Sequence, residues 1–191
     1  MPIVAVQADE QKIHRNGKYL VFQLGSEEFG VKVLQVREIM GLQEITSVPQ
    51  TPHHVKGVIN LRGKVIPVID LRLKFGLEAA EYTQRTCIIV VQISHPSGPM
   101  LMGAVVDGVA EVLSIQESEI EDTPDFGGEL TIPYILGMAK VKGKVKMLLD
   151  IDRVLSTQET GDIASLLTAP PSVEGDSASA ESGRPAVECT L

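Results

Sequence analysis

Residues 58–72 read VINLRGKVIPVIDLR, two apolar runs on either side of Arg62, Gly63 and Lys64. Val and Ile dominate both runs, and β-branched residues of this kind favour strands. The short polar interruption predicts a β-hairpin with a tight turn at Arg-Gly. Asn tolerates the positive φ of such a turn better than Arg does. Arg62 is therefore either an incidental surface charge or a side chain that something binds.

The same hairpin occurs twice in the chain. GVINLRGKVIPVIDL at 57–71 aligns with GMAKVKGKVKMLLDI at 137–151, so that a Lys-Gly turn replaces the Arg-Gly turn. Upstream of each hairpin, GVKVLQVREI at 30–39 aligns with GAVVDGVAEV at 103–112. The matches follow the same order in both copies, which indicates an internal duplication.

Each copy holds about five short strands within about 65 residues, a pattern typical of a small closed barrel that protects its edges. The strands expected before the hairpins are KYLVFQL (18–24), EFGVKVLQVREIM (28–40) and QEITSV (43–48), then TCIIVVQI (86–93) and MLMGAVVDGVAEVL (100–113). A single barrel of this size has only a small hydrophobic core, which favours two barrels that pack together. We therefore predict a mainly β protein whose first barrel spans about 18–80, whose second spans about 84–150, and whose closing helix spans about 151–158.

Helix signals are few. Thr51-Pro52 can begin a single turn, because proline suits the first helical position. Residues 151–158 place apolar side chains on one side of a short helix. DIASLL at 162–167 predicts one more helix, with Asp162 as its N-cap.

Composition limits the possible functions. The net charge of −8 and the seven Phe and Tyr residues argue against nucleic-acid binding, which needs a basic face or stacking aromatics. No apolar run approaches the ~18 residues of a membrane span, and the N-terminus lacks the pattern of a signal peptide. The two cysteines form no metal motif, so a reduced cytoplasm is expected. Residues 1–17 are predicted to be a mobile leader, and 159–191 an acidic, mostly disordered tail.

No catalytic constellation stands out. The adjacent His53 and His54 lack further ligands at metal spacing, so neither a metal nor a cofactor is expected, and an enzyme is not predicted. Glu38 and Glu111, which the repeat relates, leave one alternative open: a small-ligand or enzymatic barrel that uses paired acids in a concave polar site.

Several ordered segments resemble the family of chemotaxis coupling proteins, CheW. They are FGVKVLQVREI, SVPQTPHHVKG and GVINLRGKVIPVIDLRLKFG in the first copy, and GAVVDGVAEVLSIQESEIEDTPDF in the second. The resemblance covers about Tyr19 to Ser156. It implies two SH3-like β-barrels packed side by side, and a scaffold without catalytic activity that connects chemoreceptor tips to the histidine kinase CheA. An adaptor for a pathway other than swimming is the closest alternative.

The resemblance also implies binding residues. The contact with the kinase's regulatory domain would fall on Val36, Glu38 and Arg62, so that the hairpin turn presents Arg62 to a partner. A second ring contact would use Asp125 and Phe126. The receptor tip would lie in the groove between the barrels, where the matching positions are Val33, Lys56, Gly57, Ile88 and Val112. The apolar members of this last set could equally belong to the core.

Overall fold

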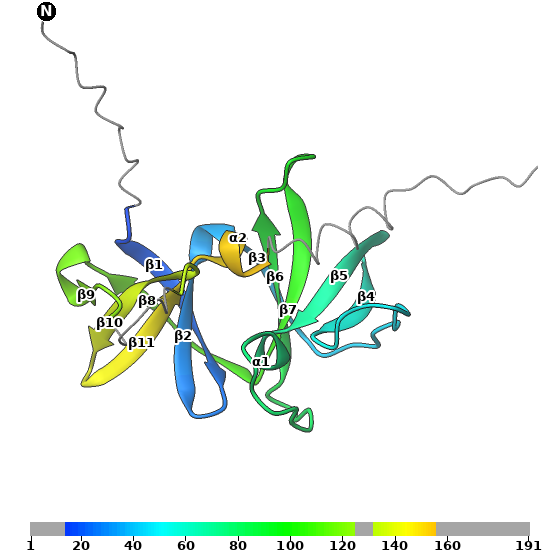
Figure 1. Cartoon of the computed structure of the whole chain (residues 1–191), viewed down its shortest axis with the longest axis horizontal. Helices are drawn as coiled ribbons and strands as arrows, with labels where there is room; N and C mark the ends of the chain where they lie inside the picture. The colour runs from blue at the N-terminus through cyan, green and yellow to red at the C-terminus, as the bar shows by residue number, and fades with distance from the viewer. Residues whose placement is uncertain (1–13, 125–131, 156–191) are drawn as a thin grey trace, which may run out of the picture.

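The computed structural model describes residues 14–124 and 132–155 and shows a mainly β fold (Figure 1). The strands are β1 (Gly17–Leu24), β2 (Glu27–Lys32), β3 (Val36–Gly41), β4 (Val55–Leu61), β5 (Lys64–Asp70), β6 (Cys87–Ile93), β7 (Met100–Val106), β8 (Gly108–Ile115), β9 (Ile120–Glu121), β10 (Ile135–Val141) and β11 (Lys144–Leu149). The helices are short: α1 (Leu71–Lys74), α2 (Ile151–Leu155) and the 3₁₀ turns η1 (Val33–Gln35) and η2 (Glu117–Glu119).

The strands form two sheets, each of which curls into a barrel. Barrel I has the order β8-β1-β2-β11-β10-β9, and barrel II has the order β3-β6-β7-β5-β4. In barrel II the chain beyond β3 returns to β4 through a bridge between Thr46 and Val58. In barrel I, β9 follows β8 and pairs with β10 in the same way. The predicted mainly β fold of two packed barrels is therefore confirmed.

The two copies exchange strands. Barrel I takes β1 and β2 from the first copy and β8, β9, β10 and β11 from the second, while barrel II takes β3, β4 and β5 from the first copy and β6 and β7 from the second. The exchange corrects the expected boundaries at 18–80 and 84–150. Its cause is a break in each of two long expected strands: η1 interrupts 28–40, and a bend at Asp107 interrupts 100–113. The chain crosses from one barrel to the other at these two equivalent places.

The largest buried cluster joins the two barrels. It contains Leu20 and Phe22 from β1 together with Ile89 and Val91 from β6. Four rings also stack in sequence, from Phe22 to Phe29 to Phe75 to Tyr134, with centroid separations of 5.9, 5.6 and 5.4 Å. Because apolar area buried in this cluster comes from both barrels, the barrels stabilise each other.

Barrel II closes only because Gly57 has no side chain. Gly57 adopts φ +136°, and a Cβ at this position would lie 2.0 Å from the carbonyl oxygen of Thr46. Gly137 occupies the same place in barrel I, where a Cβ would lie 2.8 Å from the carbonyl oxygen of Glu121. The two glycines let the closing segments approach the hairpins closely.

The short helices partly follow the expectations. α2 confirms the closing helix as far as Leu155. Thr51-Pro52 begins the expected single turn, in which the Val55 N–H donates to the Pro52 carbonyl at 2.9 Å. α1 was not expected; Asp70 caps it by accepting from the Arg72 and Leu73 N–H groups. Among the described residues no helix is long and apolar enough to cross a membrane. The expected leader up to residue 13, the helix at 162–167 and the tail lie outside these residues.

Candidate binding surfaces

The β4–β5 hairpin tip holds Arg62 in a rare backbone conformation. Arg62 has φ +51° and Gly63 has φ +85°, the signature of a two-residue type I′ turn. The side chain of Asn60 accepts a hydrogen bond from the Gly63 N–H at 2.8 Å and braces the turn. A left-handed conformation at a residue other than glycine costs about 1 kcal/mol or more.

Arg62 is paired with Glu38. Its Nη2 lies 2.8 Å from Glu38 Oε1, although the two residues belong to opposite edges of the barrel II sheet. The Arg62 side chain is 79% exposed and that of Glu38 29%. The ion pair fixes the guanidinium and leaves its other donors to the solvent, ready for a partner's carboxylate. Val36 lies half-buried on the same strand as Glu38.

The arginine at this tip is unfavourable for stability, which leads to a first prediction. Arg62→Asn should raise the free energy of unfolding by about 0.5–1 kcal/mol, because Asn tolerates positive φ better and the exposed ion pair that it removes contributes little. Urea denaturation of the two proteins measures the difference. A loss of more than about 1 kcal/mol would show that the ion pair outweighs the backbone strain.

The second copy repeats this arrangement. Lys142 has φ +52° at the β10–β11 tip, and its Nζ lies 3.4 Å from Glu111 Oε2. Below the tip, Lys146 is only 3% exposed and forms a short ion pair with Glu28 of β2. Hydrogen bonding to Lys146 holds the pKa of Glu28 below its usual range. The first copy has the core residue Ile66 where the second has Lys146, so the sequence repeat does not predict a buried charge here.

The residues predicted to bind the receptor lie on four different elements. Val33 (η1) and Lys56 (β4) are half-buried, and Lys56 Nζ lies 5.8 Å from the ring centroid of Tyr82. Val112 on β8 is 54% exposed. Gly57 is buried at the barrel closure, and Ile88 is completely buried in the core of barrel II. The last two positions therefore have structural roles in this conformation, as the core alternative allowed.

Two further positions are relevant to the candidate binding surfaces. Asp125 and Phe126, predicted as the second ring contact, lie outside the described residues. Leu34 on η1 is 87% exposed, and no sequence pattern marked it as a surface residue. Its exposure arises from the 3₁₀ turn at the crossing between barrels, which interrupts the strand periodicity and could not be read from the sequence.

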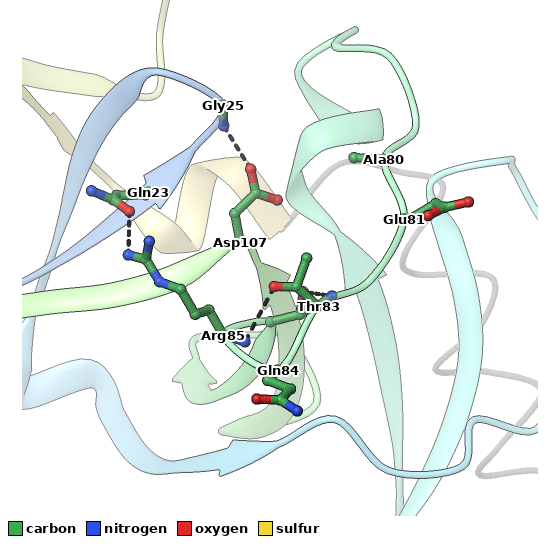
Figure 2. A pocket seen from close by; sticks show the side chains of 9 residues that line it. Gln23, Gly25, Ala80, Glu81, Thr83, Gln84, Arg85 and Asp107 are labelled. Atoms are coloured by element: carbon green, nitrogen blue, oxygen red, sulfur yellow. Dashed lines mark hydrogen bonds between the residues drawn. The ribbon is translucent and has the colours of Figure 1, made fainter.

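A polar pocket of about 550 Å³ opens beside the β1–β2 turn (Figure 2). Arg85 Nη2 donates to Gln23 Oε1 at 2.8 Å, and Asp107 accepts from the Gly25 N–H at 2.6 Å and pairs with Arg72. These polar groups therefore have hydrogen-bond or ion-pair partners within the protein. No group of three or more His, Cys, Asp or Glu side chains in the described ranges could hold a metal ion.

Both repeated acids are engaged in ion pairs with basic side chains. Glu38 is engaged with Arg62, and Glu111 with Lys142 and Lys146. What the two barrels present is a pair of hairpin tips, each with a cation held by a strand carboxylate. Because the cations at both tips are largely exposed, the tips are candidate surfaces for binding another protein.

Comparison with known proteins identifies the family. The CheW-like domain matches residues 18–159, and the chain belongs to this family of scaffold and adaptor proteins. It is 39% identical to the chemotaxis protein CheW of Klebsiella aerogenes over 74% of this chain and 83% of that protein. It is 33% identical to the chemotaxis protein CheW of Bacillus subtilis over 78% and 93%. The crystal structure of a CheW scaffolding protein from Thermoanaerobacter tengcongensis superposes with a TM-score of 0.67, at 33% identity over 75% and 95% of the two chains.

Proposed function

We propose that this protein is a non-enzymatic scaffold that couples the cytoplasmic tips of chemoreceptors to the histidine kinase CheA. Relatives that cover most of the chain are named chemotaxis proteins, and the similar solved structure is a scaffolding protein. The protein would work in the cytoplasm and be recruited to receptor arrays at the membrane. Signalling would follow from geometry, because a scaffold raises the local concentration of its partners and fixes their orientation.

The observation that carries the kinase contact is the Arg62–Glu38 pair on a braced turn. Arginine is enriched in the energetically dominant residues of interfaces, and its planar fork recognises carboxylates. Val36, on the same strand as Glu38, would add apolar area. A receptor helix would use the accessible residues Val33, Lys56 and Val112, and Asp125 with Phe126 would supply the second contact within the ring.

A second candidate is an adaptor for a receptor–kinase pathway other than swimming. One relative is not named a chemotaxis protein: Protein FrzA of Myxococcus xanthus is 28% identical over 77% of this chain and 90% of that protein. Binding to a chemotaxis receptor and its kinase distinguishes the two candidates.

The decisive experiment is co-sedimentation of the protein with a chemoreceptor cytoplasmic fragment and CheA. The wild type should form the ternary complex, and Arg62→Asp should weaken kinase binding at least 30-fold, because the charge reversal places two carboxylates together. Lys142→Asp, the same change at the repeat-related tip, is the matched control and should bind normally. A folded Arg62→Asp variant with unchanged affinity would refute the contact, and a wild type that binds neither partner would refute the coupling role.

A further inference from the structure

A second pocket, of about 280 Å³, lies where segments of the two barrels meet beside α2. It is lined by Lys74, Phe75, Pro133, Tyr134, Arg153 and Val154. The rings of Phe75 and Tyr134 stack at 5.4 Å in its wall, and two of its six lining residues are cationic. The pocket is slightly smaller than the roughly 300–1,000 Å³ of sites for drug-sized ligands, and it suits a few aliphatic side chains.

The chain leaves the described fold at the edge of this pocket. Arg153 and Val154 line it, and α2 ends at the next residue, Leu155. Arg153 is held in place there, since its Nη1 donates to the Pro133 carbonyl at 2.9 Å and its Nε lies 3.3 Å from Asp150 Oδ2. Whatever follows Leu155 therefore starts beside an apolar hollow with a cationic rim.

The sequence that follows has complementary chemistry. Residues 157–191 contain six acidic side chains and a single basic one, Arg184. Ile163, Leu166 and Leu167 have the spacing i, i+3 and i+4, which places them on one face of the helix predicted at 162–167. These residues are the only large aliphatic cluster in that part of the sequence.

We propose that residues 162–167 bind this pocket within the same chain. Ile163, Leu166 and Leu167 pack against Phe75 and Tyr134, and the acids that precede them, Glu159 and Asp162, face Lys74 and Arg153. The six residues between Leu155 and Asp162 can span about 20 Å, so the tether reaches the pocket. A short tether also gives an effective concentration in the millimolar range, which lets a small contact persist.

The contact would close the junction between the barrels. Phe75 follows α1 of barrel II, and Tyr134 leads into β10 of barrel I, so a segment that packs on both rings ties the two barrels together. The inference does not depend on the proposed coupling function, because it concerns two parts of one chain.

Hydrogen–deuterium exchange of the full chain tests the proposal. In the wild type, amides at 162–167 should exchange at least 10-fold more slowly than those of an unstructured peptide. Leu166→Ser/Leu167→Ser should abolish this protection and also accelerate exchange around Phe75 and Tyr134. The matched control Val173→Ser/Val187→Ser removes two other aliphatic residues from the same part of the sequence and should change neither region.

A peptide of residues 157–170, added to the double serine variant, should restore protection around Phe75 and Tyr134. Random-coil exchange at 162–167 in the wild type would overturn the proposal. So would protection there that disappears in the variant without any change around the two rings, because the segment would then bind elsewhere. A pocket that gains protection only at high protein concentration would show that a second copy occupies it, which also contradicts the proposal.

Discussion

Glu28→Leu will lower the free energy of unfolding by about 3–5 kcal/mol, because it leaves the ammonium group of Lys146 buried without its main partner. Lys146 is 3% exposed inside barrel I, and the other carboxylate near it, Glu111 Oε1, is 3.9 Å away and also faces Lys142. Chemical denaturation of the variant and the wild type measures the loss.

Two further variants test this explanation. Glu28→Leu/Lys146→Met should recover stability to within about 1–2 kcal/mol of the wild type, because an apolar pair can replace a buried ion pair. Glu121→Leu removes the exposed partner of Lys140 from the same barrel and should cost less than about 1 kcal/mol. If the single variant Glu28→Leu costs no more than Glu121→Leu does, Lys146 has found solvent or another partner.

The same pair has a pH dependence with a defined sign. The pKa of Glu28 is lowered in the folded state, chiefly by its hydrogen bond to Lys146. A lowered carboxyl pKa contributes stability above the unfolded pKa and loses it as the pH falls through the folded value. The stability difference between wild type and Glu28→Leu/Lys146→Met should therefore shift in favour of the double variant below about pH 4.

Gly57→Ala will destabilise the fold by about 3–5 kcal/mol. The new methyl group would lie 2.0 Å from the Thr46 carbonyl oxygen, and φ +136° is a conformation that residues with a Cβ rarely adopt. The clash is with backbone, so no side-chain rotation relieves it, and the Thr46–Val58 closure of barrel II must open. Thermal and urea denaturation measure the effect.

Gly63→Ala is the matched control for this substitution. Gly63 also has a positive φ, +85°, but a Cβ there would meet no atom within 4 Å. The control should therefore lose only about 1 kcal/mol, the cost of the backbone conformation. If both substitutions lowered the free energy of unfolding equally, backbone strain would explain the whole effect of Gly57→Ala. The close approach to Thr46 would then contribute nothing.

The sequence was sufficient to predict what is local. Alternating β-branched runs around Arg-Gly and Lys-Gly predict two hairpins, and both turns have the positive φ values that such turns require. The duplication was also readable, because residues of the same type recur in the same order. The exchange of strands between the copies could not be predicted from the duplication. Pairing between copies depends on which strands become neighbours in space, and the sequence alone does not show this.

Lys146 illustrates this limit. Its alternating lysine-rich surroundings, KVKGKVK at 140–146, look like a solvated strand. Lys146 is buried because β11 lies parallel to β2, a strand from the other copy, which brings in Glu28 from 118 residues away. Glu38 and Arg62 are both assigned to the kinase contact by the family resemblance, and in the structure Arg62 Nη2 lies 2.8 Å from Glu38 Oε1. Ile88, selected in the same way, proves to be a core residue.

The exchange of strands also constrains how the protein is made. During synthesis β1 and β2 emerge first, but their barrel neighbours β8 and β11 begin only at Gly108 and Lys144. Barrel II, whose strands all lie between Val36 and Val106, can close first, whereas barrel I cannot close until β11 has left the ribosome. Barrel I therefore departs from the common pattern in which a unit folds as it is synthesised. Two separate copies with the same pairing would form a domain-swapped dimer, in which each partner supplies strands to the other's barrel. The present chain thus has the topology of such a dimer joined covalently.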